Sequence, residues 1–379
     1  MRRAAAVAVL ALLLAGCATF PDSGPREWRE KVEDTGELGG PPLVPEPQPL
    51  PQVPEPGETP GQSAPVPPPS GCVDLDPQVV ATCLDPVGAI AVLPDAETAL
   101  VAERTTGRVL EVRQGGEPRL LATVPTDASG GGGLTGLVLS PSFVEDQLLY
   151  AYTTTPTDNR LVRIAPDEPP KPVLTGIPRG SSNNGGALGV DVDGSLLVAT
   201  GDAGLPADPT SLAGKVLRVN TLGSPARGNP DPASPILSSG LRAPGGVCTD
   251  PLTTMTWVTD RTPTEDVLHL LVPGALPAPA WTWPERPGVA GCTAQPGLVT
   301  ITETDGAALY VLRPGEGGAF TGTPETILED TYGRLSAATL APDGLLWLGT
   351  VNQSGSTPVP SDDRVIRIQP PATGGEGRA

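Results

Sequence analysis

Apolar and polar residues repeat along the chain in a pattern that predicts short β-strands. One unit, a turn followed by a short apolar run, occurs six times, with 38 to 57 residues between successive turns. Most of the turns contain Pro-Asp, Asp-Gly or Asp-Pro, pairs that favour tight turns. The apolar runs lie at 99–102, 148–152, 196–200, 255–259, 308–312 and 345–349.

A second run follows most copies and alternates apolar with polar or charged residues. It is clearest at 107–112, 159–164, 214–219 and 363–368. A period of two is typical of half-buried strands, and helical periodicity is almost absent from the chain.

Strand pairs that recur about every 50 residues are typical of propeller blades. Six copies therefore predict an all-β, six-bladed β-propeller over residues 71–370. The 47 glycines and 49 prolines suit such a loop-rich chain. An array of two-sheet sandwiches is the alternative, but it would not explain the regular recurrence.

The N-terminus has the features of an export signal. An uncharged apolar run at 4–14 follows two arginines and is too short to span a bilayer, which takes roughly 20 residues. Leu-Ala-Gly then precedes Cys17 and matches the lipobox cleaved by lipoprotein signal peptidase. We expect 1–16 to be a lipoprotein signal peptide and the lipid on Cys17 to anchor the protein to the outer face of the cell membrane. An ordinary signal peptide is the alternative.

The segment 17–70 is expected to be a disordered tether. It has almost no apolar periodicity, and nearly half of the residues at 41–70 are proline. Such a composition cannot bury enough apolar surface to fold. At about 3.1 Å per residue, the extended chain would reach on the order of 100 Å. Residues 371–379 are expected to form a disordered tail.

Four cysteines remain after Cys17, an even number that predicts disulfides in an exported domain. Three pairings are possible, and proximity favours Cys72–Cys83 and Cys248–Cys292. A zinc site is disfavoured because the chain has no C-x-x-C pair and only one histidine.

A net charge of −19 argues against nucleic acid as a partner, because binding a phosphate backbone requires many lysines and arginines. A soluble acidic surface explains the charge more simply.

Short motifs spread over the chain point to one known family. They include the run at 86–104, the segments 133–136 and 140–143, Asn184-Gly185-Gly186, and the loop at 200–204. Together these motifs resemble the glucose/sorbosone dehydrogenase family, in the right order from about 86 to 369, and most of all its tethered lipoprotein branch in actinobacteria. The resemblance implies a six-bladed propeller, and the catalytic members bind pyrroloquinoline quinone and Ca²⁺ to oxidise sugars.

The resemblance also places the family's catalytic base at Asn183, where catalytic members have a histidine. An amide cannot accept the sugar hydroxyl proton at any useful pH. The only histidine of the chain, His269, falls in a predicted strand at 266–271 and is expected on the strand surface.

The positions that would hold the cofactor are reduced as well. Ser182 replaces an acidic residue, and the family's Arg-Asn pair is Arg242-Ala243 here. Of the two arginines in the family's Arg-x-Arg-Asp run, only Arg334 is present. Glycines replace the acidic residue and glutamine before Gly133, and 260–263 departs from the run that supplies calcium ligands. No cofactor is therefore assigned; the quinone and Ca²⁺ are implied by the resemblance alone.

We interpret the chain as a propeller that has lost quinone-dependent oxidation and serves binding or scaffolding in the cell envelope. Asn183, Asn184, Arg242 and Arg334 are expected to line its pocket, where they suit a polyol or an anionic glycan. One alternative is a working dehydrogenase with Asp202 or Asp260 as base. Another is a protein-interaction propeller with a relic pocket.

Two further groups allow a functional and a structural interpretation. Asp191, Asp193 and Asp202 could bind calcium, but a turn and a loop cap are the simpler roles. Trp281 and Trp283 could form a sugar platform, but core packing is favoured.

Overall fold

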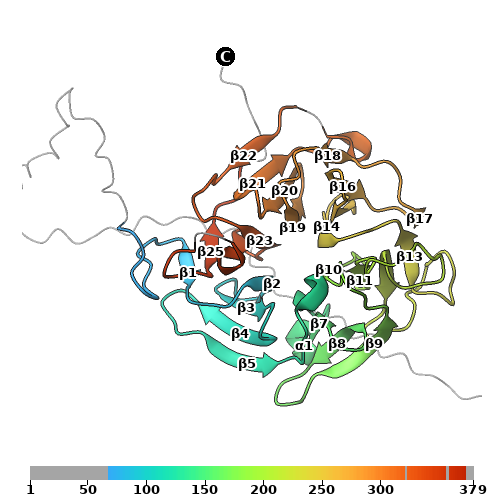
Figure 1. Cartoon of the computed structure of the whole chain (residues 1–379), viewed down its shortest axis with the longest axis horizontal. Helices are drawn as coiled ribbons and strands as arrows, with labels where there is room; N and C mark the ends of the chain where they lie inside the picture. The colour runs from blue at the N-terminus through green and yellow to red at the C-terminus, as the bar shows by residue number, and fades with distance from the viewer. Residues whose placement is uncertain (1–66, 321, 356–357, 373–379) are drawn as a thin grey trace, which may run out of the picture. The chain divides into compact units, whose positions relative to one another are not determined.

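Six sheets, all antiparallel except for one short parallel pair, are arranged around a central axis and form the folded part of the chain (Figure 1). The computed structural model describes residues 67–320, 322–355 and 358–372. The predictions for the signal peptide, for Cys17, for most of the tether and for 373–379 lie outside these residues. The all-β, six-bladed propeller is confirmed.

Each blade starts with its innermost strand and proceeds outward. Blade 1 contains β2 (Val87–Val92), β3 (Thr98–Glu103), β4 (Arg108–Arg113) and β5 (Arg119–Thr123). Blade 2 contains β6 (Leu134–Leu139), β7 (Leu149–Thr154), β8 (Asn159–Ile164) and β9 (Lys171–Ile177), with the short helix α1 (Phe143–Asp146) between its first two strands. Blade 3 contains β10 (Gly186–Val190), β11 (Leu196–Thr200), β12 (Lys215–Val219) and β13 (Ile236–Ser239).

Blade 4 contains β14 (Pro244–Thr249), β15 (Thr256–Arg261), β16 (Asp266–Leu270) and β18 (Trp281–Trp283). Between its last two strands the chain returns to blade 3, where β17 (Gly274–Ala275) pairs in parallel with β13. Blade 5 contains β19 (Val289–Gln295), β20 (Leu298–Glu303), β21 (Ala308–Leu312) and β22 (Glu325–Ile327).

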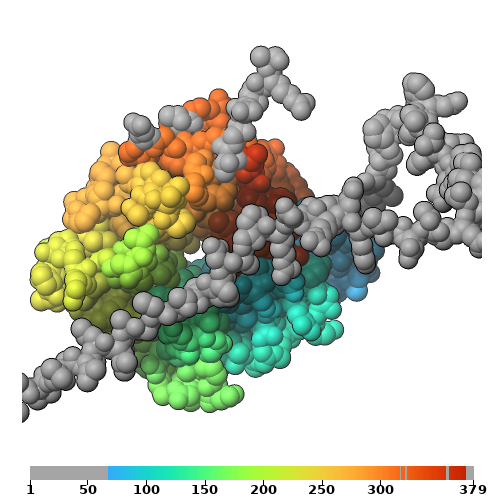
Figure 2. Space-filling view, turned by 180° about the vertical axis from the view of Figure 1, so that it is seen from behind, coloured from blue at the N-terminus to red at the C-terminus, as the bar shows by residue number. Residues whose placement is uncertain are grey.

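Blade 6 closes the ring with strands from both ends of the domain. Its inner strands are β23 (Leu335–Leu340), β24 (Leu346–Thr350) and β25 (Val365–Ile368), and its outer strand is β1 (Val79–Ala81). β1 pairs antiparallel with β25, so Val79 lies opposite Ile366. Seen from behind, the red C-terminal blade adjoins the blue-green N-terminal blade (Figure 2).

The predicted strands correspond to two positions in the blades. Five of the six apolar runs overlap the second strand of a blade, and the alternating runs overlap the third strands of blades 1, 2, 3 and 6. The run at 308–312 is the exception, because it is β21, a third strand. The second strand of blade 5, β20, follows a Pro-Gly turn that the repeat pattern missed.

Apolar side chains fill the spaces between neighbouring blades. Leu100 of blade 1, for example, shares a cluster with Leu137, Leu149 and Ile164 of blade 2. The inner strands approach so closely that a Cβ added to Gly88 would lie 2.1 Å from the Leu134 carbonyl oxygen. Residue 88 must therefore be glycine for blades 1 and 2 to pack as they do.

Both expected disulfides are present. Cys72–Cys83 joins the segments on either side of β1, and Cys248–Cys292 joins the inner strands of blades 4 and 5. Within the described residues, no helix has the length and apolar character needed to cross a membrane.

Candidate functional site

The predicted pocket residues lie on one face of the ring, called here the N-face because the six inner strands begin there. Asn183 and Asn184 precede β10, Arg242 precedes β14, and Arg334 precedes β23. The second strands of the blades end at the same face. Backbone hydrogen bonds connect these loops, including those from the Asp202 N–H to the Arg242 carbonyl and from the Val351 N–H to the Arg334 carbonyl.

Asn183 has a left-handed backbone with φ of 51°, a conformation that asparagine tolerates better than most residues. Its Nδ2 donates to Asp202 Oδ1 at 2.9 Å, and the same oxygen accepts the Gly204 N–H at 2.7 Å. The Asn183 side chain is thus a hydrogen-bond donor held by an aspartate. It supplies no group that can take up a proton.

Asn184 is fully buried, and its amide bonds to the backbone of two loops. Nδ2 donates to the carbonyls of Gly130 and Gly180 at 3.0 and 2.8 Å, and Oδ1 accepts the Gly180 N–H at 2.8 Å. These bonds hold the glycine-rich loop at 130–133 against the loop before β10. The Asn184 amide is therefore occupied with shaping the site and is not directed at a ligand.

Asp260 holds the loop that carries Arg242. Its carboxylate accepts the N–H groups of Arg242, Ala243 and Arg261 at 2.9, 2.6 and 3.0 Å and is 1% exposed. Burial raises its pKa to about 6, although the three N–H groups favour the charged form. A carboxylate enclosed in this way positions the loop and is not accessible to a substrate hydroxyl.

Two arginines that were not predicted to act together lie near enough on the N-face for their charges to interact. Arg104 follows β3 in blade 1, and Arg261 ends β15 in blade 4. Burial, and then the positive charge of Arg261, lower the pKa of Arg104. Arg104 donates to the carbonyls of Gly132 and Gly131 at 3.0 and 2.9 Å.

Arg242 and Arg261 are the available cations of this face. Neither guanidinium forms an ion pair or a hydrogen bond with any residue in the described ranges. Arg261 Nε is buried without a partner. Cations in such an environment favour an anionic ligand, because a carboxylate would restore the hydrogen bonds lost on burial.

Arg334 differs from these two because it already has a carboxylate partner. Its Nη1 lies 2.7 Å from Asp305 Oδ1, and its N–H donates to Asn352 Oδ1 at 2.7 Å. It borders a cavity of about 410 Å³ between blades 5 and 6, which also contains Asp330, Asp362 and Arg364. Arg334 can bind an anion only by sharing or leaving Asp305.

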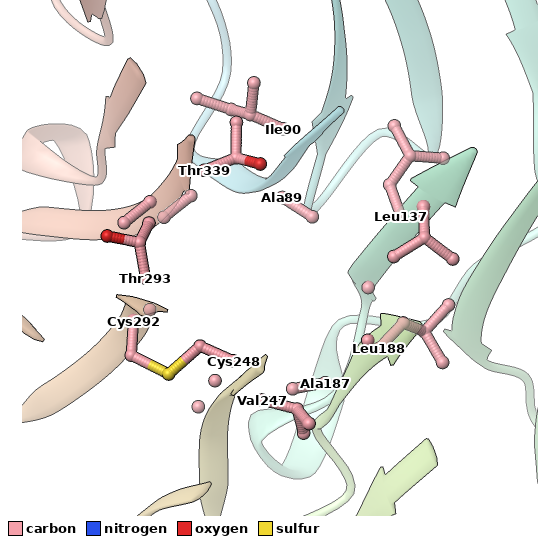
Figure 3. A pocket seen from close by; sticks show the side chains of 18 of the residues that line it. Ala89, Ile90, Leu137, Ala187, Leu188, Val247, Cys248, Cys292, Thr293 and Thr339 are labelled. Carbon is pink, nitrogen blue, oxygen red and sulfur yellow. A yellow bond between two sulfur atoms is a disulfide. The ribbon is translucent and has the colours of Figure 1, made fainter. Parts of the chain in front are cut away.

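The axis of the ring contains a channel of about 240 Å³ lined by all six inner strands. Small and apolar side chains surround it, together with hydroxyl groups such as those of Thr293 and Thr339 and the Cys248–Cys292 disulfide (Figure 3). No charged residue is among those that line it. The chemistry of the site is therefore confined to the N-face loops above the channel.

His269 lies inside blade 4, not on the strand surface that we expected. It is 8% exposed on β16, and burial lowers its pKa. The alternation along β16 predicts an outward side chain. The segment between β16 and β18, which contains β17, places Pro277 against His269 and covers it. Because it is enclosed in blade 4, on a strand away from the loop of Asn183, His269 cannot take the role of the base expected there.

The remaining candidates have structural roles. Asp191 and Asp193 both pair with Arg218, at 2.7 and 2.5 Å. Trp283 is buried in the apolar cluster between blades 4 and 5, and Trp281 packs at its edge. Across the described residues, no three His, Cys, Asp or Glu side chains converge in a way that could hold a metal ion.

The fold defines the class of six-bladed β-propellers, and here arginines lie at the N-terminal ends of the inner strands. The glucose/sorbosone dehydrogenase family model matches residues 84–286, more than half of the chain. The chain therefore belongs to this family.

Solved structures agree with this assignment. The PQQ-bound aldose sugar dehydrogenase of Streptomyces coelicolor is 32% identical, with a TM-score of 0.72 over 77% of this chain and 96% of that one. A putative oxidoreductase (glucose dehydrogenase) of Thermus thermophilus is also 32% identical, with a TM-score of 0.70 over 76% of this chain and 98% of that one. The apo soluble aldose sugar dehydrogenase of Escherichia coli, at 21% identity and a TM-score of 0.65, shares the fold over 77% of this chain and 99% of that one. No curated protein sequence is significantly similar to the chain.

The residues present do not fit a site of quinone-dependent oxidation. Asn183, which the resemblance places at the position of the base, donates to Asp202, and Asp260 is enclosed by three backbone N–H groups. Of the N-face arginines in the described ranges, Arg104 is bound to carbonyls, Arg179 to Asp127, and Arg334 to Asp305. The guanidinium groups of Arg242 and Arg261 remain for a tricarboxylate.

Proposed function

We propose that this protein is a lipid-anchored propeller of the glucose/sorbosone dehydrogenase family that binds an anionic saccharide on its N-face and does not oxidise sugars. The observation that carries the proposal is the pairing of Asn183 with Asp202 where the family has its catalytic histidine. Arg242 and Arg261, which have no ion-pair partner among the described residues, support an anionic ligand.

An acidic sugar suits this face because its parts match the groups available. The carboxylate of an acidic sugar can accept paired N–H bonds from one guanidinium, and the ring hydroxyls of the sugar can bond to the Asn183 and Asp202 side chains. Since the surrounding protein is strongly acidic, an arginine-bearing face is the natural position for an anion.

The binding test compares glucuronate with glucose by calorimetry on the purified protein. Glucuronate should bind more tightly than glucose, and Arg261→Ala should weaken its binding about ten-fold, the equivalent of roughly 1.4 kcal/mol. Equal affinities for the two sugars, or an unchanged affinity in Arg261→Ala, would contradict an anion site.

The catalytic test adds pyrroloquinoline quinone and Ca²⁺ and follows dye reduction with aldoses. We expect no turnover, because an amide is expected at the base position and the Asp202 carboxylate beside it is held by Asn183 and the Gly204 N–H. The alternative, a dehydrogenase with a rearranged site, is supported by the 32% identity to the PQQ-bound Streptomyces coelicolor enzyme. Turnover that disappears without the quinone would establish that alternative.

The anchoring through Cys17 rests on the lipobox and is tested separately. Labelled palmitate should enter the wild-type protein and not Cys17→Ser, and the variant should leave the membrane fraction. Both disulfides suit an oxidising compartment outside the cytoplasm. Equal labelling of both proteins would refute lipidation at this cysteine.

A further inference from the structure

Glu303, the last residue of β20, occupies a buried position, and its carboxylate has no partner among the described residues although its oxygens still reach solvent. It is 5% exposed, and no residue in the described ranges donates a hydrogen bond to its side chain or forms an ion pair with it. It belongs to blade 5, and neither the fold nor the proposed function uses it.

Blade 1 shows how a carboxylate at the same position can have all its hydrogen-bond partners within the chain. Glu103, the last residue of β3, is also fully buried. Its carboxylate accepts the Asp85 N–H at 3.1 Å, the Thr106 hydroxyl at 2.5 Å, and the Arg108 guanidinium at 2.5 and 2.8 Å. A buried carboxylate with this set of donors is compensated in charge and in hydrogen bonds.

The two positions are equivalent in the ladders of their blades. Glu103 lies opposite Val87 of the inner strand, and Glu303 lies opposite Val289. Glu303 also lies opposite Ala308 at the start of β21, and in blade 1 the start of β4 is Arg108. The turns between these strands match, because residues 107 and 307 both have positive φ, 72° and 48°.

Every donor that serves Glu103 is missing at the matching position around Glu303. Asp85 corresponds to Pro287, which has no N–H, and Thr106 corresponds to Gly306, which has no hydroxyl. Arg108 corresponds to Ala308, so the compensating cation is missing too. Three independent replacements remove the whole set of donors while the carboxylate stays.

The surroundings of Glu303 favour a positive charge. Burial, and then the negative charges of Glu285, Asp266 and Glu329, raise its pKa to about 7. A Cβ added to the exposed Gly306 would lie 2.5 Å from Glu303 Oε2, so the carboxylate lies directly against an open turn. A small cationic group can therefore approach it from the surface beside residue 306.

The geometry selects the kind of cation. The described carboxylates do not converge as a metal site requires. A guanidinium or ammonium group needs only one carboxylate and supplies its own N–H donors, as Arg108 does in blade 1. We propose that Glu303 is the anchor of a site at the junction of blades 4 and 5 that binds a guanidinium or ammonium group from outside the chain.

The test follows backbone amide NMR signals of Thr304 to Ala308 at pH 8, where the carboxylate is ionised. The probes are methylguanidine and the peptide acetyl-Gly-Arg-Gly-amide, with acetyl-Gly-citrulline-Gly-amide as the uncharged control. We expect saturable shifts with methylguanidine or with the arginine peptide, and none with the citrulline peptide. Shifts with both probes mean that a small free guanidinium or ammonium compound can occupy the site. Shifts with the peptide alone mean that the cation comes from a polypeptide.

Two variants make the result specific. Glu303→Gln removes the charge with little change of shape, and Ala308→Arg supplies the internal cation found in blade 1. Each should weaken binding at least ten-fold while near-ultraviolet circular dichroism shows the native fold. If one variant fails to fold, the loss of probe binding in the other variant still tests the role of the Glu303 carboxylate.

Three results would overturn the proposal. They are no saturable shift with either cationic probe at 10 mM, roughly equal shifts in Glu303→Gln, or shifts with Ca²⁺ alone. The glucuronate titration of the N-face is a separate measurement, so failure at Glu303 would not be confused with failure of the proposed function.

Discussion

Replacing Glu303 by glutamine should make the protein more stable at pH 8 and leave it almost unchanged at pH 5. Burial and three acidic neighbours raise the pKa of Glu303 from 4.5 to about 7. In this interval the folded state binds more protons than the unfolded state, so the free energy of unfolding falls as the pH rises. Above about pH 7 the loss is complete.

The size of the effect follows from the two pKa values. Each pH unit between them costs about 1.4 kcal/mol, and solvent screens part of this cost because the carboxylate oxygens reach water, so the wild type should lose on the order of 2 kcal/mol between pH 5 and pH 8 through this group. Burial also raises the pKa values of Asp260 and Asp363 to about 6, so these two carboxyl groups likewise lower the free energy of unfolding as the pH rises. They are present in both proteins and cancel in the difference between variant and wild type.

The assay is urea unfolding of wild type and Glu303→Gln at pH 5, 6, 7 and 8, without added amines. The difference in unfolding free energy should grow steadily with pH. Glu103→Gln is the matched control, and it should be destabilised at every pH because it leaves Arg108 without its full partner. If the unfolding free energies of Glu303→Gln and the wild type run parallel from pH 5 to pH 8, the reasoning is refuted. Such a result would mean that folding does not raise the pKa of Glu303.

Three further changes test the architecture. Replacing Cys248 and Cys292 together by alanine should cost about 4 kcal/mol, from the chain entropy of a 44-residue separation, and urea unfolding would measure it; an unchanged midpoint would contradict this. Asn184→Ala should cost about 3 kcal/mol by leaving buried backbone groups unsatisfied, and amide exchange in the loop at 130–133 should become faster; unchanged exchange would show that the amide does not hold this loop. Gly88→Ala should destabilise by more than about 2 kcal/mol because its Cβ meets the Leu134 carbonyl, and a native melting temperature would show that the blades can separate without cost.

The sequence predicted the blades because their signal is local. A turn and a following apolar run lie within ten residues of each other, and alternation reports which residues of a strand are buried. The prediction failed at Asp305-Gly306, because a turn before a third strand has the same residues as a turn before a second strand. Only the pairing of β20 with β19 distinguishes them.

The site was less predictable because its decisive contacts join distant segments. Arg104 and Arg261 approach each other only because a six-membered ring places blades 1 and 4 on opposite sides of one axis. The sequence marked Asn184 as a pocket residue from its motif, but its burial depends on the loop at 130–133. His269 was misplaced for a similar reason, since a later segment covers it.

The closure of blade 6 has a consequence for how the chain can fold. β1 cannot pair until β25 exists, and β25 lies near the C-terminal end of the domain, so the ring is completed by a contact of very high sequence separation. Contacts of this kind slow folding, because a long loop must close before they form. A chain that stops before Val365 would leave β24 as an open edge, available for pairing with another molecule. The pairing of β25 with β1 and β24 is therefore the contact that closes the ring and covers this edge.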